Sequence, residues 1–270
     1  MSAIDVLQRD ELTARGETPG SPDGAAPHRL RLALRYLGMP ALVAAAYGIL
    51  YLYVRGSELD SIERRLLNAG SLRRAATEHL DISLWATALV LVVAIPVGVT
   101  LTRPWARRLT PAVIAVANIG QGVPAIGTLV LIFIALFRNG RTAAILGLAA
   151  YAFLPVLRAT MVGLDQVDRR VIKAARGMGM SKAEVLRRIE LPLSVPILLT
   201  GVRIALVLVV STAVLAAFIG GGTLGGIILG GFAQTRPLVV VTGAVLAAGF
   251  ALLADWLGGI AEDVLSPRGL

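Results

Sequence analysis

Six apolar runs, each near the length needed to cross a lipid bilayer, are the feature that most constrains how this chain folds. A helix rises 1.5 Å per residue, so about 20 apolar residues cover the ~30 Å hydrocarbon core. Because no water satisfies backbone groups there, helices are the favoured spanning structure. We therefore predict an all-α multispan membrane protein with about six transmembrane helices, the short fourth one able to lengthen past Arg158. The runs lie near residues 37–54, 82–101, 111–137, 142–157, 193–219 and 238–257.

The composition supports a membrane protein and excludes several other classes. Apolar residues make up 56% of the chain and charged residues only 16%, which is too little polar surface for a soluble domain of this length. The basic residues behind the +9 charge lie between apolar runs, so we expect the lipid bilayer and no nucleic acid as a partner. The absence of cysteine excludes disulfides and thiolate chemistry. With His28 and His79 as the only histidines, no metal site is expected.

The residues before the second run divide into three segments. Residues 1–28 are polar and rich in Pro and Gly, which predicts a flexible tail. Residues 29–54 contain the first apolar run and are expected to form an extra N-terminal transmembrane helix. Residues 55–81 alternate charges with leucine and isoleucine, which predicts an amphipathic helix at the membrane interface, with His79 also at an interface.

Six spans place both termini on one side of the membrane, and the Lys and Arg counts indicate which side. With both termini in the cytoplasm, the cytoplasmic segments hold 17 of the 26 basic residues and the outer segments hold eight. Basic residues are enriched in cytoplasmic loops, so this orientation is favoured. The five outer arginines in residues 55–81 weaken that preference.

Residues 163–190 form a charged, glycine-punctuated loop between the fourth and fifth runs. The pattern predicts two short helices joined by a turn, with Gly177 ending the first. Ser181 and Glu184 have the spacing of a capping box at the start of the second helix. Pro192 lacks a backbone donor and is expected to bend the chain into the next span. A short basic hairpin of this kind favours a docking surface over a catalytic site.

Six residues of this region stand at a fixed spacing: Ala174, Ala175, Gly179, Ile189, Leu191 and Pro192. The pattern resembles the EAA loop of the membrane subunits of binding-protein-dependent ABC importers. Lys173 stands where that family has Glu, which leaves open any salt bridge made by the family Glu. The resemblance implies that these residues, with Lys173 and Gly177, dock a cytoplasmic ABC ATPase, and that this partner hydrolyses ATP. The chain has no Gly-x-x-x-x-Gly-Lys-Ser/Thr phosphate loop, so we expect a non-catalytic subunit without a cofactor.

The stretch 118–127 in the third apolar run is too rich in Gly and Pro for a uniform helix. Broken backbone at membrane depth is tolerated where it is buried in protein or lines a wet cavity. Asn118, Gln121 and Pro124 are therefore candidates for a translocation path. The alternative is that both amides hydrogen-bond a neighbouring helix.

A second glycine-rich stretch, 218–231, follows the fifth run. Glycines permit sharp turns and close backbone packing, as a gate or re-entrant segment would need. A flexible exterior loop is the alternative, disfavoured because several side chains here are too apolar for open water. The candidate gate residues are Gly220, Gly221, Leu224 and Gly225.

Further sequences extend the resemblance: Asn-Ile-Gly-Gln at 118–121, Gly-Met-Gly-Met at 177–180, Gly-Val-Arg at 201–203 and Phe-Ile-Gly at 218–220. They are similar to permeases that take up quaternary-amine osmoprotectants, such as glycine betaine, choline, carnitine and proline-type osmolytes. The likeness covers about three quarters of the chain and implies an importer core at 82–267.

That resemblance also implies partners. A second copy or a sister permease would pair with the chain in the bacterial inner membrane, and an extracytoplasmic substrate-binding protein would deliver the solute. Aromatic residues make up only 5% of the chain and form no clustered set. A cage for a quaternary ammonium needs such a cluster, so selectivity is expected to reside in the binding protein.

Arg203 is the one ionisable residue well inside a predicted span. A central arginine costs about 2.5–3.5 kcal/mol on insertion scales, so it faces protein or water, or reaches an interface. It is a candidate path residue, although it would repel a cation. Asp165 and Asp255 are expected at span ends, which disfavours an ion-coupled secondary transporter. The residues leave three rival functions open: an ABC permease for a different small solute, such as an amino acid or oxyanion, the disfavoured ion-coupled carrier, and a membrane scaffold without transport.

Overall fold

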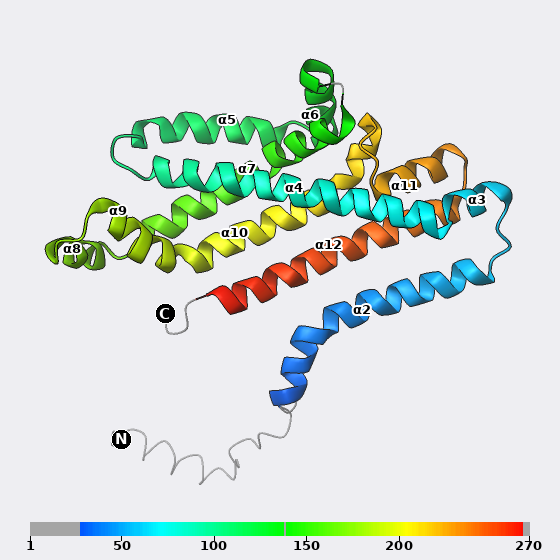
Figure 1. Cartoon of the computed structure of the whole chain (residues 1–270), viewed down its shortest axis with the longest axis horizontal. Helices are drawn as coiled ribbons and strands as arrows, with labels where there is room; N and C mark the ends of the chain where they lie inside the picture. The colour runs from blue at the N-terminus through cyan, green and yellow to red at the C-terminus, as the bar shows by residue number, and fades with distance from the viewer. Residues whose placement is uncertain (1–27, 138, 267–270) are drawn as a thin grey trace, which may run out of the picture. The chain divides into compact units, whose positions relative to one another are not determined.

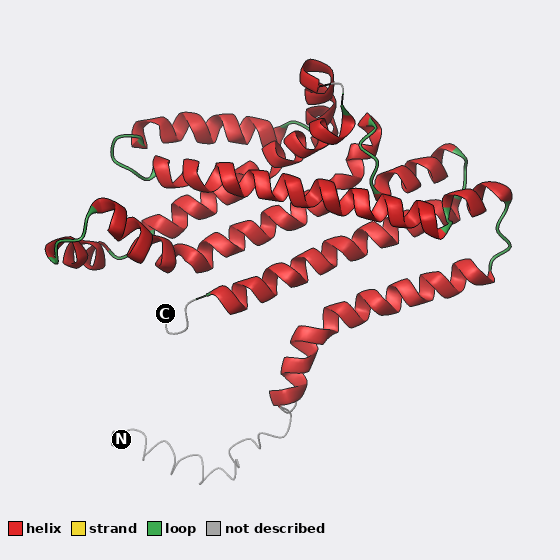
Figure 2. Cartoon of the chain, in the orientation of Figure 1, coloured by secondary structure: helices red, strands yellow, loops and turns green. Residues whose placement is uncertain are grey.

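The computed structural model describes residues 28–137 and 139–266, and every regular element within them is helical (Figure 2). The chain divides into two compact units, residues 1–38 and 39–270. Of the first unit, only the beginning of helix α2 is described. The tail predicted at 1–28 therefore lies outside the described residues, apart from His28.

Long helices form the framework of the second unit, as the apolar runs predict. Five helices of the described chain are long and apolar enough to cross a membrane, and a bent helix pair makes six if it counts as one span. The fourth run does lengthen past Arg158, because α7 continues to Asp165. The helices are α2 (His28–Gly56), α3 (Ser61–Leu66), α4 (Ala69–Leu101), α5 (Thr110–Gly122), α6 (Ala125–Ile132), α7 (Gly140–Asp165), α8 (Arg169–Gly177), α9 (Lys182–Val185), α10 (Leu191–Thr212), α11 (Leu224–Ala233) and α12 (Pro237–Leu265).

The third apolar run is sharply bent. The helical segments Arg107–Gly122 and Ala125–Ala135 meet at 101°. Pro124 has no N–H and disfavours helical backbone at the residue before it, and Val123 is accordingly extended, with ψ 133°. The break predicted in 118–127 is confirmed, and it divides the run into two short apolar helices.

The prediction of a single amphipathic helix over 55–81 is wrong. The segment contains the end of α2, the short helix α3 and the first turns of α4. Asp60 and Asn68 start the two new helices, because their side chains accept hydrogen bonds from backbone N–H groups in the first turn. The bonds from Glu63 and Ile62 lower the pKa of Asp60.

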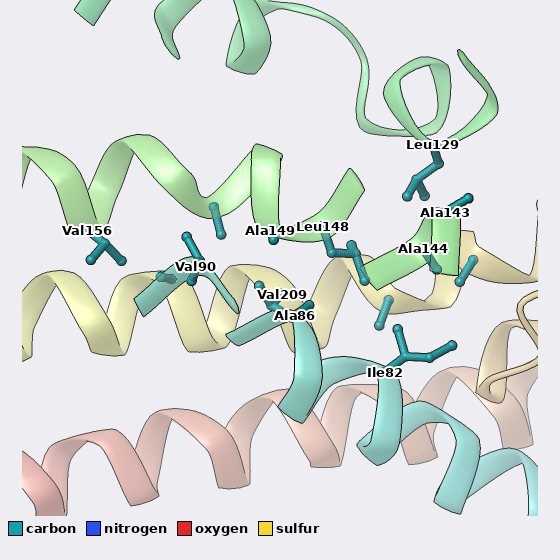
Figure 3. Packing of buried hydrophobic residues seen from close by; sticks show 14 of the residues in the cluster. Ile82, Ala86, Val90, Leu129, Ala143, Ala144, Leu148, Ala149, Val156 and Val209 are labelled. Carbon is teal, nitrogen blue, oxygen red and sulfur yellow. The ribbon is translucent and has the colours of Figure 1, made fainter. Parts of the chain in front are cut away.

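Small residues let α4, α7 and α10 pack closely side by side (Figure 1). A Cβ on Gly98 of α4 would lie 2.8 Å from the Thr160 side chain of α7, and one on Gly201 of α10 would collide with Ala159 of α7. Figure 3 shows the buried cluster between these helices, where alanines such as Ala144 leave room for the larger aliphatic side chains. Membrane helices associate through such small-residue contacts.

His79, which was expected at an interface, lies inside the helix bundle. The side chain is completely buried. Its Nε2 lies 3.0 Å from the carbonyl oxygen of Val210 on α10, and its ring centroid lies 5.7 Å from that of Phe250 on α12. The first turns of α4 therefore belong to the packed bundle.

Candidate functional site

The loop 163–190 folds as the predicted hairpin and lies at one end of the bundle, opposite the end that carries α11 (Figure 1). Helix α8 ends in a Schellman turn, in which the N–H of Met180 donates to the carbonyl of Ala175 at 3.2 Å. Gly179 has φ 91°, the left-handed conformation that glycine adopts without a steric penalty. Gly179 therefore reverses the chain, whereas Gly177 is the last residue of α8.

The capping box at the second helix is confirmed. The N–H of Ser181 donates to Glu184 Oε2 at 2.8 Å, and the N–H of Glu184 donates to Ser181 Oγ at 3.2 Å. The chain does not break at Pro192, because Lys182–Ile219 is one continuous helical stretch. A π turn at Leu186–Glu190 ends two residues before the proline, as occurs where regular helical bonding is interrupted. The hairpin thus continues directly into α10.

The outer surface of the hairpin combines apolar and basic side chains. Val171 and Met178 are 42% and 77% exposed. Lys173 and Ala174 also face solvent, whereas Ala175 is only 1% exposed. This surface can bind a protein through apolar contact and positive charge.

An ion pair that the sequence did not predict holds the base of the hairpin. Arg103 Nη2 lies 2.5 Å from Glu190 Oε2, and Glu190 is 7% exposed. Glu190 stands between Ile189 and Leu191 of the matched pattern, and all three residues are at least partly buried. The pair ties the hairpin to the connection between α4 and α5. Its two residues are 87 positions apart, so local spacing carried no signal for it.

Asn118 and Gln121 both hydrogen-bond α7. Arg158 Nη2 donates to Asn118 Oδ1 at 2.8 Å, and Gln121 Nε2 donates to the carbonyl of Tyr151 at 3.1 Å. Just beyond them, Pro124 stands at the start of α6. The two amides therefore fasten α5 to its neighbouring helix beside the break.

Arg203 is paired with carboxylates of α12. Its Nε and Nη2 donate to the two Asp255 oxygens at 2.7 Å each, and its Nη1 lies 3.5 Å from Glu262 Oε2. Thr200 Oγ1 donates to Glu262 Oε1 at 2.7 Å. Helix α12 runs on to Leu265, which places both acids within the last long helix. The sequence signal was the run 238–257 continuing through Gly258, Gly259 and Ile260.

The glycine-rich stretch after α10 is tightly packed. Gly220 has φ 73°. A Cβ on Gly221 would lie 2.9 Å from a backbone oxygen of the preceding turn, and one on Gly225 would collide with the carbonyl oxygen of Val214. Leu224 is completely buried. The packing contradicts a flexible exterior loop and leaves a rigid corner between α10 and α11.

A methyl group at Gly225 is expected to destabilise the protein, whereas one at Gly226 is not. Gly225→Ala places a methyl group against the backbone carbonyl of Val214, and overpacking of this kind costs about 1–3 kcal/mol. Gly226 has no neighbour within 4 Å, and alanine is favoured over glycine in a helix by about 0.8–1.0 kcal/mol. Thermal unfolding of the two variants in detergent checks this. Equal midpoints for both variants would contradict the tight corner.

Comparisons with known proteins agree with this geometry. Residues 92–265 match the family described as binding-protein-dependent transport system inner membrane component. The glycine betaine/carnitine/choline transport system permease protein OpuCB of Bacillus subtilis is 37% identical over 203 residues, which cover 75% of this chain and 92% of that protein. The osmoprotectant import permease protein OsmY of Salmonella typhimurium is 34% identical over 241 residues, covering 89% of this chain and 99% of that protein.

The fold is also that of a solved transporter. A chain of the MetNI methionine ABC transporter in an inward-facing conformation matches with a TM-score of 0.63 and 26% identity, covering 73% of this chain and 96% of that chain. The family match covers more than half of the chain, and the relatives exceed 30% identity over most of their length. The chain therefore belongs to the binding-protein-dependent transport system inner membrane components, the permease subunits of ABC importers.

Proposed function

We propose that this ABC importer permease takes up quaternary-amine osmoprotectants. The observation that carries the proposal is the 37% identity, over 92% of its length, to the Bacillus subtilis permease named for glycine betaine, carnitine and choline. The choline permease OpuBB of that organism is also 37% identical over 203 residues. Identity to the methionine transporter is lower, at 26%, which makes an amino acid the second candidate class.

The hairpin α8–α9 is the proposed docking surface for a cytoplasmic ATPase, which binds and hydrolyses ATP. Val171 and Ala174 of α8 and Met178 directly after it are exposed and supply apolar contact, and the neighbouring basic side chains supply charge. Because α9 continues into α10, a displacement of the hairpin is passed directly to a membrane span. The pair Arg103–Glu190 would pass it to the α4–α5 connection as well.

This role requires the hairpin to face the cytoplasm, and both termini with it, in agreement with the positive-inside count. Residues 82–267 would form the importer core, pairing with a second copy or a sister permease. Residues 29–54 would add a helix outside that core. A substrate-binding protein would dock on the opposite face of the membrane and supply the solute.

The face formed by α10 and α12 is proposed either to line the translocation path or to contact the second permease. A cavity of 570 Å³ there is lined by Thr200, Arg203, Asp255 and Glu262. Their charged side chains are roughly one third exposed. Charges at membrane depth face protein or water rather than lipid, so this face is expected to be covered or wet. Asn118, Gln121 and Pro124 at the break in the third run, and the corner at 220–225, are the other proposed path and gate positions.

Uptake of labelled glycine betaine and choline tests the substrate class. Cells that contain the matching ATPase and binding protein are compared with and without this chain. We expect ATP-dependent uptake of at least one solute that disappears when the chain is deleted. Excess unlabelled carnitine should compete, whereas methionine should not.

Two other outcomes would redirect the assignment. If the complex assembles and hydrolyses ATP but neither solute enters, the osmoprotectant proposal fails and another small solute must be sought. If uptake persists without the ATPase and stops when the ion gradient is collapsed, ion-coupled transport replaces the ATP-driven mechanism.

A further inference from the structure

A cavity of 1020 Å³ lies beside the C-terminal half of α2, outside the surfaces discussed above. Its volume is at the upper end of the roughly 300–1,000 Å³ typical of small-molecule sites. Helices α2, α3, α4 and α12 and the connection between α2 and α3 all contribute to its walls. Its buried and half-buried lining residues include Tyr47, Leu50, Val54, Leu67, Leu72, Thr242 and Leu246.

Helix α2 contacts α12 around Tyr47. Tyr47 donates its hydroxyl to the carbonyl of Leu246 at 2.8 Å, and its ring fits against Gly249, where a Cβ would collide with it. Elsewhere α2 has few protein contacts, because only 6% of its apolar window is buried, against 33% or more in the other four candidate spans. The cavity therefore occupies space that side chains of this unit do not fill.

Two exposed arginines line the mouth of the cavity. They are Arg55, in the last turn of α2, and Arg64, in α3. In the described part of the chain, neither forms an ion pair, whereas Asp60 at the same mouth is paired with Arg236 at 2.6 Å. Glu58 also lines the mouth without a cationic partner among the described residues. The rim thus offers two guanidinium groups and one carboxylate.

The position of this rim in the membrane indicates what occupies the cavity. Arg55 follows the apolar run of α2, at the depth where a bilayer changes from hydrocarbon to headgroups. Tyr47 lies eight residues before it, about 12 Å deeper at the helical rise. An apolar slot that begins at headgroup depth and continues into the hydrocarbon matches the outline of a lipid, and arginine pairs well with phosphate.

We propose that this cavity binds one phospholipid, with its phosphate held by Arg55 and Arg64 and an acyl chain lying along Tyr47, Leu50 and Leu246. An amine-bearing headgroup would place its ammonium near Glu58. The bound lipid fills the gap between α2 and the bundle and so fastens the first span to the rest of the chain. In the proposed orientation the site lies in the outer leaflet, but the binding itself depends only on the cavity and its rim.

Native mass spectrometry of the full-length chain in detergent tests this site. Palmitoyl-oleoyl phosphatidylethanolamine is added to delipidated protein, and the fraction carrying one lipid is measured against concentration. We expect a single tight adduct, and diacylglycerol, which lacks the phosphate, should bind about tenfold more weakly. Equal binding of diacylglycerol would overturn the arginine–phosphate contact, and the absence of any one-lipid adduct would overturn the site.

Matched variants locate the adduct on the molecule. Arg55→Gln with Arg64→Gln should weaken phosphatidylethanolamine binding about tenfold, whereas Arg65→Gln, an exposed neighbour outside the cavity lining, should not. Leu50→Trp should fill the slot and remove the adduct. Leu52→Trp, on a side chain 69% exposed and outside the lining, should retain it. If each control weakens binding as much as its partner variant, the lipid lies elsewhere on the surface and the proposal is wrong.

Discussion

Replacing Gly179 with valine is expected to reduce ATP-driven uptake about tenfold, and clearly more than the same change at Gly177, which also lies on the docking hairpin but does not form its turn. Both glycines have open space around them, with no heavy atom within 4 Å. They differ in backbone conformation, because Gly179 has φ 91° and Gly177 ends α8 in the helical region. A left-handed residue with a side chain costs about 1–2 kcal/mol, and more when it is β-branched. The hairpin would relieve that strain by changing its turn, which misplaces the docking surface.

Uptake assays with both variants measure this difference, and copurification of the ATPase shows whether docking is the step lost. Gly179→Val should insert and remain folded, because the turn lies outside the bundle core. Unchanged uptake in Gly179→Val, or an equal loss in both variants, would contradict the role given to the turn.

Neutralising Asp255 is expected to destabilise the protein. Asp255→Asn removes the bidentate partner of Arg203 and leaves Glu262 at 3.5 Å as the remaining partner. An unpaired arginine within a span costs about 2.5–3.5 kcal/mol, and the one-third exposure of the pair reduces that cost. We therefore expect the free energy of unfolding to fall by about 2 kcal/mol. Chemical denaturation in mixed micelles measures it.

Two further variants separate pairing from simple loss of a side chain. In Arg203→Gln/Asp255→Asn the arginine charge is removed, and only Glu262 stays charged, with its hydrogen bond from Thr200, so the double variant should be more stable than Asp255→Asn alone. Arg74→Gln breaks an exposed i,i+4 pair whose arginine is 82% exposed, and should leave the free energy of unfolding nearly unchanged. If the double variant is less stable than Asp255→Asn, the loss of stability does not come from an unpaired arginine.

Local signals in the sequence predicted local structure well. The break at Val123 and Pro124, and the capping box of Ser181 and Glu184, both appeared where the residues indicated. Each depends on backbone groups within a few positions, so the sequence contains all the information needed. The single helix predicted over 55–81 does not form, because Asp60 and Asn68 cap two separate helices within that amphipathic pattern.

Ion pairs between residues far apart in the chain, by contrast, were not predicted. Arg203 meets Asp255 across 52 positions, and Arg103 meets Glu190 across 87. Helix periodicity states which face a residue occupies but not which other helix lies opposite that face. The burial of His79 was not predicted for the same reason. The charges around it in the sequence resemble those of an interfacial segment.

By itself, the sequence determined the all-helical class, the set of apolar spans and the two-helix loop with its six matched positions, because hydrophobic length, capping and glycine spacing act over short distances. Only the tertiary structure decided which helices are neighbours, that Arg203 pairs with the acids of α12, and that a cavity remains beside α2. These features arise where segments far apart in the chain come into contact, and that contact depends on the packing of the whole bundle.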